Sequence, residues 1–594
     1  MMHGVSDKSA AWLPSMKDLK SSSPKQVVPS LLGRVIGTED STPLEFWIAV
    51  AEGQYAQLDD VVALERTLPD GRLVRMYGVV IQVRARHEGA RFDSDVFLIA
   101  DGILPAEVSQ SAQIATTRFE PELFVPPLPG QPVRRAVDEE RDRALNFDVM
   151  QRRLPVGLSR DNDPFFVNMD FLDGTRGAHV NISGISGVAT KTTYASFLLY
   201  SLFQSEALGT DALNTKVLIY NVKGEDLLFL DKENIRLSGD QRARYSRLGL
   251  SPGGFRSVEF WAPPKRNDVN AVPDVATRQR GVTSFFWSIA EFCTQDLLPF
   301  LFADAEDDRQ QYTIVIHNVM ARLRTAGELG DGGVSIEGVA IRKFHDLVEL
   351  IAERVRDETT MHDWAGPAIG QGTVNAFVRR LYGSVSHVAH MIRGDIPHPD
   401  KHAIRREAQV TVVDIHNLND RAKRFVVGVT LKRMFREKEE SGQARPLTFV
   451  VLDELNKYAP RDGSSPIKEI LVDVSERGRS LGIILVGAQQ TASEVERRIV
   501  SNSAIRVIGR LDAAESGRDE YGFLPAIHRQ RATILKPGTM ILSQPELPIP
   551  VVLEFPFPSW ATRASEAGKG KTQVSKGTAD TEEDDPFEGL TGGE

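Results

Sequence analysis

The sequence has one cysteine, lacks long apolar runs and carries fewer positive than negative charges. Its single cysteine, Cys293, excludes an intramolecular disulfide framework and cysteine-rich zinc modules. No run approaches the ~20 apolar residues that cross a bilayer. The first residues (MMHGVSDKSA) also lack the basic patch and apolar stretch of a secretory signal. We therefore expect a cytoplasmic protein without a membrane segment.

The charge balance is acidic, with 71 Lys and Arg against 81 Asp and Glu and a net charge of −10. This excludes a protein that simply coats nucleic acid with positive charge, but it leaves room for a local basic lining inside an assembly. Hydrophobic residues at 41% and charged residues at 26% are ordinary globular usage. At ~150 residues per domain, 594 residues predict about four units.

The N-terminal third is predicted to hold a flexible segment (1–26), a small antiparallel β-barrel (27–112) and a connector (113–164). Short β-like runs separated by turn residues indicate the barrel: Leu31–Ile36, Phe46–Val50, Val61–Glu65, Leu73–Val83 and Val96–Ile99. Five prolines in 120–133 favour an extended connector, because proline fits neither a helix interior nor a central strand.

From about residue 165 onward, apolar β runs alternate with helical patterns, which predicts an α/β fold with a parallel sheet. The runs are His179–Ile182, Val217–Tyr220, Val410–Val413, Thr448–Leu452, Gly482–Val486 and Ile505–Ile508. We expect a core in two parts, 165–225 and 409–560, with a helical insertion over 226–408. The Gly/Lys/Thr-rich and then acidic residues 561–594 are expected to be a disordered tail.

A β run is followed by a glycine-containing loop and a helix (HVNISGISGVATKTTYA), the recipe for a nucleotide-phosphate site. Gly184 and Gly187 let backbone N–H groups turn toward phosphate oxygens, and the helix N-terminus adds its own donors. Lys191 is expected to reach the β and γ phosphates, and the hydroxyl of Thr192, with Thr193 beside it, to ligate Mg²⁺. Thr190 stands where the usual pattern G-x-x-x-x-G-K-[ST] has glycine, so the loop must take a modified path or bind phosphate less well. The alternative interpretation is a Gly/Ser turn that joins a strand to a core helix.

A second strand-like run (LTFVVLDELNKYAP) ends in two carboxylates, Asp453 and Glu454. Asp453 is expected to hold the Mg²⁺ shell and Glu454 to polarise the attacking water of ATP hydrolysis. Ligands of parallel sheets bind at the carboxyl ends of the strands, where both this pair and the glycine loop fall. The alternative interpretation is an ordinary strand that ends in a solvated acidic turn.

The chain after this strand predicts a helix and a further strand. Ser465-Pro466 is a favourable helix start, and Gly478 is the expected terminator. Arg479 lies beyond that end and is a candidate to act across a subunit boundary, with plain surface charge as the alternative. The next strand ends at Gln489, whose amide could sense the γ-phosphate or orient water, with a surface glutamine as the alternative.

With these motifs in order, the chain resembles the HerA family of hexameric DNA-translocating ATPases, in the FtsK/HerA branch of P-loop proteins. The resemblance covers most of 27–560 and rests on three stretches: the barrel segments (LLGRVIG, RLVRMYGVVIQV), the phosphate loop, and FVVLDELNKYAP followed by SERGRSLGIILVGAQQTASEV. It implies a RecA-like P-loop core with a helical insertion and an N-terminal small β-barrel like that of the family.

The resemblance also implies site residues and partners. It maps the family's trans-acting arginine onto Arg479 and a second arginine onto Arg176, places Asn221 where members often carry Asp, and matches Glu225 to an acidic residue. It further implies ATP and Mg²⁺ as cofactors, a homo-hexamer with double-stranded DNA in its pore, and a NurA-like nuclease or another effector on the barrel face. Lys265, Arg266 and Arg278–Arg280 are candidates for the pore lining, with surface charge as the alternative.

Three functions compete: an ATP-driven DNA motor for end resection and repair, a ring scaffold that regulates a phage-defence effector (a sirtuin-like NADase or a nuclease) with a weak nucleotide site, and a conjugation-type pump. Thr190 favours the scaffold, and the predicted barrel counts against the pump. No zinc site is expected at His398 and His402, because flanking prolines prevent a helix from presenting both. Cys293 fits a buried apolar position better than a nucleophile.

Overall fold

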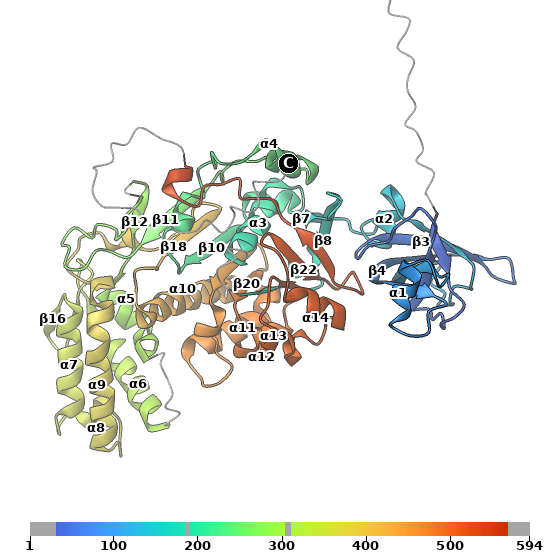
Figure 1. The fold of residues 1–594 in the computed structure, drawn as a ribbon. Coiled ribbons are helices and arrows are strands. Elements are labelled where there is room, and N and C mark those ends of the chain that lie inside the picture. The colour runs from blue at the N-terminus through green and yellow to red at the C-terminus, as the bar shows by residue number, and fades with distance from the viewer. Residues whose placement is uncertain (1–30, 186–190, 279, 303–309, 568–594) are drawn as a thin grey trace, which may run out of the picture. The chain divides into compact units, whose positions relative to one another are not determined.

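The computed structural model describes residues 31–185, 191–278, 280–302 and 310–567. The chain divides into two compact units, 1–144 and 145–594. Each is described separately below (Figure 1).

The described part of the first unit is a closed β-barrel with the strand order β1-β2-β5-β4-β3-β6 and antiparallel pairing. Alternating apolar residues fill it, among them Leu32, Ile48 and Ile114, which are fully buried. Its elements are β1 (Leu31–Val35), β2 (Glu45–Val50), β3 (Val61–Thr67), β4 (Leu73–Glu88), α1 (Asp95–Ala100), β5 (Glu107–Glu120), β6 (Pro132–Arg135) and α2 (Asp138–Ala144).

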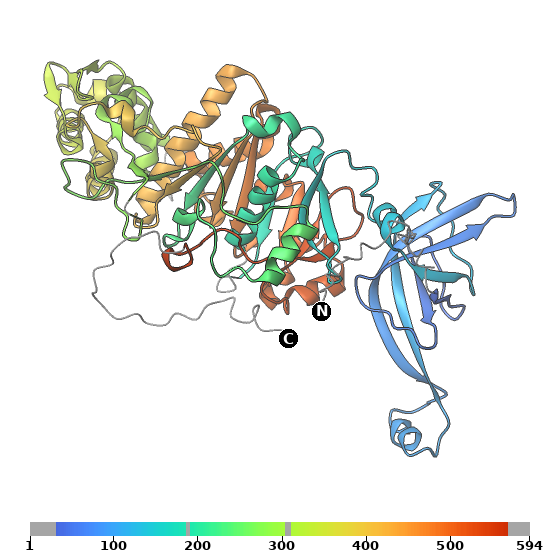
Figure 2. The same cartoon turned by 90° about the horizontal axis from the view of Figure 1, so that it is seen from above.

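The predicted barrel is confirmed as a fold, but two details of the expectation were wrong. Two barrel strands, β5 and β6, run beyond residue 112, so the segment expected as a connector completes the barrel. The run Val96–Ile99 is a helix, α1, at the tip of the long β4–β5 hairpin (Figure 2). A four-residue apolar run is ambiguous between strand and helix, and here the Asp95 carboxylate accepts backbone N–H groups of Arg91 and Phe92 and closes the local turn.

The second unit is built on one sheet, for which the described residues supply twelve strands in the order β12-β11-β18-β10-β19-β20-β9-β21-β22-β23-β7-β8. The pairs from β12 to β21 are parallel and those from β21 to β8 are antiparallel. The strands are β7 (Arg153–Leu158), β8 (Pro164–Asn168), β9 (Val180–Ser183), β10 (Lys216–Asn221), β11 (Val258–Ala262), β12 (Val282–Ser284), β18 (Val410–Asp414), β19 (Thr448–Asp453), β20 (Ile483–Gln489), β21 (Ile505–Ile508), β22 (Thr539–Ser543) and β23 (Val551–Glu554).

Helices cover both faces of this sheet, and α3 lies on the face opposite to α10 and α11 (Figure 1). The longer helices of the unit are α3 (Lys191–Gln204), α4 (Gly239–Arg247), α6 (Gln310–Leu323), α7 (Phe344–Arg356), α9 (Gln371–Val388), α10 (Asp420–Ser441) and α11 (Pro466–Leu481). Shorter ones are α5 (Ile289–Thr294), α8 (Met361–Trp364), α12 (Arg497–Ser501), α13 (Ala513–Ser516) and α14 (Ala526–Ala532). All six β runs predicted for this region are strands of the sheet, so the predicted RecA-like α/β core with an N-terminal barrel is confirmed.

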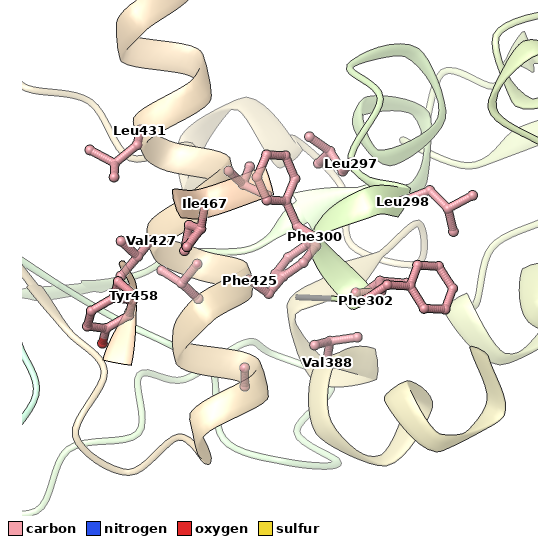
Figure 3. Close-up of a cluster of buried hydrophobic side chains, with 14 of the residues drawn as sticks. Leu297, Leu298, Phe300, Phe302, Val388, Phe425, Val427, Leu431, Tyr458 and Ile467 are labelled. Carbon is pink, nitrogen blue, oxygen red and sulfur yellow. The ribbon is translucent and has the colours of Figure 1, made fainter. Parts of the chain in front are cut away.

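The predicted helical insertion, 226–408, is helical only in part. Its strands β11 and β12 extend the main sheet, while α5 to α9 form a helical region with the short strands β13 (Trp287–Ser288), β14 (Gly327–Glu328), β15 (Val334–Ile336), β16 (Val339–Ile341) and β17 (Ile392–Arg393). The segment η4 (Leu298–Phe302) inserts Phe300 among Phe425 and Ile467 of the core helices (Figure 3). The helical region therefore shares one apolar core with the sheet domain.

Two further boundaries differ from the expectation. The helix predicted from Ser465-Pro466 is α11, capped by the Ser465 hydroxyl, but it ends at Leu481 with Gly482 at φ +67° rather than at Gly478. Gly478 is needed for close packing instead, because a Cβ there would lie 2.7 Å from the carbonyl oxygen of Ile483. Glu566 is buried and accepts hydrogen bonds from Thr562, so the fold continues to residue 567, whereas 568–594 lie outside the described residues.

Candidate nucleotide site

Four neighbouring parallel strands end at the same edge of the sheet and bring the predicted site residues together. In the order β10-β19-β20-β9, one strand separates the glycine-loop strand β9 from the acidic strand β19. Asp453 ends β19, Gln489 ends β20, and Gly184 follows β9. The carboxyl ends of parallel strands are where ligands bind in open α/β sheets.

The glycine loop is described at its two ends. Gly184 follows β9, and a Cβ there would lie 3.3 Å from both the Arg510 carbonyl oxygen and the Gly509 Cα, so glycine permits a close approach of the chain after β21. Lys191 is 5% exposed, and its ammonium donates to the Gly184 carbonyl oxygen at 2.6 Å. Gly187 and Thr190, both predicted to bind phosphate, lie outside the described residues.

Burial lowers the pKa of Lys191 to about 8, although the nearby Asp453 carboxylate acts to raise it. An ammonium desolvated in this way is stabilised by an incoming anion. Lys191 begins α3, and a helix N-terminus with its free N–H groups and positive dipole end also favours an anion. The charge arrangement at this end of the loop therefore suits a phosphate group.

Thr192 and Asp453, the two residues predicted to hold Mg²⁺, are in direct contact although 261 positions separate them in the sequence. The Thr192 hydroxyl donates to Asp453 Oδ2 at 2.9 Å, and Asp453 is 3% exposed. A hydroxyl beside a carboxylate is a set of hard oxygen donors of the kind that Mg²⁺ prefers, so the residues present fit that ion. Thr193 follows in the same first turn of α3.

Glu454 turns the chain sharply at the end of β19. Its backbone has φ +55° and ψ +46°, a left-handed conformation that few non-glycine residues adopt, and its N–H donates to Asp453 Oδ1 at 2.8 Å. Its carboxylate contacts Lys457 at 2.8 Å and Lys223 at 3.0 Å. Burial alone would raise the pKa of Glu454, but the bonds from Lys457 and Lys223 outweigh it and lower the pKa. Glu454 is therefore ionised at neutral pH, and it follows Asp453 directly in the chain.

Lys223 contacts both acidic residues, although no motif in the sequence pointed to it. It lies two residues after β10 and contacts Asp453 Oδ2 at 3.3 Å as well as Glu454 Oε1. The signal that could have indicated Lys223 was its position two residues after the buried strand β10, which pairs with the acidic strand β19. No spacing rule links that position to a strand tip 230 residues further along the chain.

Gln489 lies at this edge, and its side chain is bonded to side chains of the neighbouring strand β9. It is fully buried, and its Nε2 donates to Asn181 Oδ1 at 2.8 Å and to Ser183 Oγ at 2.9 Å. Its Oε1 is buried without a hydrogen-bond partner. In this arrangement the Gln489 amide links β20 to β9 beside the glycine loop. Its role toward a γ-phosphate stays a prediction.

The two arginines implied by the resemblance lie at the opposite edge of the sheet. Arg479 is in the last turn of α11, just before β20 begins, and donates to the carbonyl oxygens of Gly174 at 2.8 Å and Thr175 at 2.7 Å. Arg176 precedes β9 and is also exposed. Because β20 and β9 run from this edge to the site, neither arginine is part of the site of its own chain.

Asn221 and Glu225 have structural partners rather than contacts with Asp453 or Glu454. The Asn221 amide donates both to the Gly224 carbonyl oxygen at 2.7 Å and to Asp414 Oδ1 at 2.9 Å. An ionised aspartate at this position would have no N–H to donate to either acceptor. Glu225 accepts the backbone N–H of Thr277 at 2.7 Å.

The basic residues suggested for a DNA-lining surface differ in their surroundings. The Arg278 guanidinium is largely buried, pairs with Asp231 and lies 4.1 Å from the centre of the Phe260 ring. Its charge is therefore already neutralised within the chain. Lys265, Arg266 and Arg280 are exposed, and residue 279 lies outside the described residues.

Comparison with solved structures finds chains that align with this one at low sequence identity. VirB4 of Thermoanaerobacter pseudethanolicus is 14% identical, covering 68% of this chain and 96% of its own, with a TM-score of 0.42. The trigonal form of the bacterial conjugative coupling protein TrwBdeltaN70 with sulphate is 11% identical, covering 72% and 95%, with a TM-score of 0.45. TrwB in complex with ADP and Mg²⁺ is 10% identical over the same shares, with a TM-score of 0.43.

These values are too low to transfer any function to this chain. No protein-family model and no curated protein matches it. None of the helices in the described ranges has the length and apolar character that a bilayer crossing requires.

Proposed function

We propose that this chain hydrolyses ATP at the carboxyl edge of its sheet and uses the energy to move DNA. The observation that carries the proposal is the contact between Thr192 and Asp453 beside Glu454, because it joins the helix after the glycine loop to the acidic strand. If Asp453 and Glu454 formed only a solvated acidic turn, no hydrogen bond from the first turn of that helix would be expected.

The residues divide the chemistry among them. The Lys191 ammonium would bind phosphate oxygens, and Thr192 and Asp453 would hold Mg²⁺, which neutralises charge on the phosphates when bound. Glu454 would orient the attacking water and accept its proton, since the carboxylate is ionised and lies next to Asp453. The γ-phosphorus gains a bond to the water oxygen and loses its bond to the β-γ bridging oxygen, which leaves with ADP.

A ring is part of the proposal because Arg479 is at the far edge of its own sheet and could serve only a neighbouring subunit's nucleotide. We propose a homo-hexamer of HerA type with duplex DNA in its pore. A NurA-like nuclease on the barrel face would make the complex a machine for DNA end resection and repair.

ATP turnover tests the proposal most directly. Phosphate release from ATP with Mg²⁺ should be measurable in the wild type and should rise with linear duplex DNA. Lys191→Ala should abolish it, because the variant loses the ammonium at the phosphates, while Lys401→Ala, at an exposed lysine, should not change it. Turnover that Lys191→Ala leaves intact would refute the proposal.

One sequence feature favours a second candidate, a ring scaffold that regulates a phage-defence effector such as a sirtuin-like NADase or a nuclease. Thr190 before Lys191 resists the positive φ that glycine would adopt, which weakens phosphate binding. A scaffold predicts slow turnover that DNA does not stimulate, with or without the effector. A motor predicts stimulation.

A further inference from the structure

One ammonium contacts both acidic side chains of the site. Lys223 Nζ is 3.3 Å from Asp453 Oδ2 and 3.0 Å from Glu454 Oε1. Asp453 Oδ1 is engaged by the Glu454 N–H, and Oδ2 by the Thr192 hydroxyl. Lys223 and Thr192 therefore meet the same carboxylate oxygen.

Lys223 is held in place by its own turn, although its side chain is 44% exposed. The Asn221 amide donates to the Gly224 carbonyl oxygen, and Lys423 Nζ donates to the Val222 carbonyl oxygen at 3.2 Å. Gly224 has φ +56°, which completes the turn. Hydrogen bonds fix the backbone on both sides of Lys223. Its side chain therefore starts from a defined position next to the two carboxylates.

A second lysine gives an internal comparison. Lys457 contacts Glu454 Oε2 at 2.8 Å and Asp420 at 3.9 Å, so it shares Glu454 with Lys223 but pairs with a different aspartate. Glu454 thus has an ammonium on each oxygen. Of these two ammonium groups, Lys223 is the one that bridges to Asp453.

We propose that Lys223 is a positioning residue that competes with the divalent cation for Asp453 and couples cation binding to the release of Glu454. This rests on the proposed function. A cation bound at Asp453 would repel the ammonium, because two positive charges about 3 Å apart in a partly buried site are unfavourable. Lys223 would leave Asp453 and loosen its contact with Glu454, so the base would become free when the metal arrives with the nucleotide.

The metal alone provides the first test. Thermal unfolding of the full chain is followed while MgCl₂ is increased at constant ionic strength, without nucleotide. Without Mg²⁺, Lys223→Met should unfold at a lower temperature than the wild type. Mg²⁺ should raise the unfolding temperature of Lys223→Met, with a half-saturating Mg²⁺ concentration about fivefold lower than that of the wild type. Lys457→Met, which loses an ammonium from Glu454 only, and Lys223→Arg, which keeps the charge, should respond like the wild type.

Nucleotide binding provides the second test and separates the two proposals. For a fluorescent non-hydrolysable ATP analogue, the half-saturating Mg²⁺ concentration should fall by a similar factor in Lys223→Met. Equal Mg²⁺ dependence in Lys223→Met and the wild type, in both series, would overturn the role of Lys223. A wild type that binds no nucleotide at any Mg²⁺ concentration would overturn the proposed function, while the metal series would still decide whether Lys223 and Mg²⁺ compete.

Discussion

Two strands of the sheet, β19 and β18, end in a buried aspartate, and the surroundings give these aspartates different properties. Only β10 separates the two strands, so Asp453 and Asp414 lie at the same edge. Asp453 contacts an ammonium, a hydroxyl and a backbone N–H. Asp414 contacts the Asn221 amide and His416 Nδ1 at 2.9 Å.

We call the carboxyl ends of these strands the β19 tip and the β18 tip. The stability contributed by the two tips changes with pH in opposite directions. At the β19 tip, the lowered pKa of Glu454 means that its contribution to stability is present at neutral pH and is lost on acidification. At the β18 tip, burial raises the pKa of Asp414, and the bond with Asp414 raises the pKa of His416. Both of these groups bind protons more tightly in the folded chain, so their contribution falls as pH rises. The β19 tip is suited to a cation, and the β18 tip to a proton.

The largest expected effect comes from substituting one acid at each tip. Glu454→Gln should lower ATP turnover by about 100-fold or more, because the amide cannot accept a proton from water. Asp414→Asn should leave turnover within about threefold of the wild type, since an amide oxygen can still accept from Asn221. Phosphate release with Mg²⁺ and DNA measures both.

Nucleotide affinity serves as the control for this pair of variants. Glu454→Gln should still bind a non-hydrolysable ATP analogue, which separates a loss of chemistry from a loss of binding. If Asp414→Asn lost turnover as fully as Glu454→Gln, the division of roles between the two tips would be wrong.

The next effect tests why the β18 tip needs an amide neighbour. Asn221→Asp would remove two donated hydrogen bonds and place a second carboxylate against Asp414, at a cost of about 2–4 kcal/mol in unfolding free energy at neutral pH. Part of this cost should be recovered at lower pH, where Asp414 binds a proton and can donate to the new carboxylate.

Urea denaturation at several pH values measures this effect, with Asn221→Ala as the matched control. The alanine variant loses the same donors without adding charge, so only the aspartate variant should recover on acidification. Parallel pH dependence in the two variants would mean that repulsion at Asp414 is not the cause.

Much of the second unit's sheet could be predicted from sequence because its central strands are continuous apolar runs between turn signals. The runs near Val217, Val410 and Thr448 all became strands. The elements whose bounds were predicted wrongly are those in which the local sequence pattern favours one structure and the tertiary packing requires another. Gly478 looks like a helix terminator, but the α11 helix continues past it because tight packing, rather than backbone freedom, requires the glycine.

The sequence indicated Lys191 with Thr192, and Asp453 with Glu454, because one local motif contains each pair. The structure brings Thr192 and Asp453 into contact, while the role of these residues toward a nucleotide stays a prediction. A contact was not predictable where the partner comes from a third strand, as for Lys223. The partner of a side chain at a strand end was also hidden: the Gln489 amide donates to Asn181 on the neighbouring strand β9. Which strands are neighbours decides these contacts, and sequence spacing does not encode strand order.

The smallest effect concerns the proton at the β18 tip. His416 faces Asp414 and Glu225, which favour its charged form, and Lys423, which opposes it. Its folded pKa is raised, so the stability that it adds is fully present below its unfolded value of about 6.5 and is lost as pH rises through the folded value. His416→Gln should therefore lower the unfolding temperature by about 1–2 °C in acid and leave it unchanged in alkali. His362→Gln, at an exposed histidine, is the control, and a difference from wild type that stays constant with pH in His416→Gln would show that the pair with Asp414 does not bind a proton.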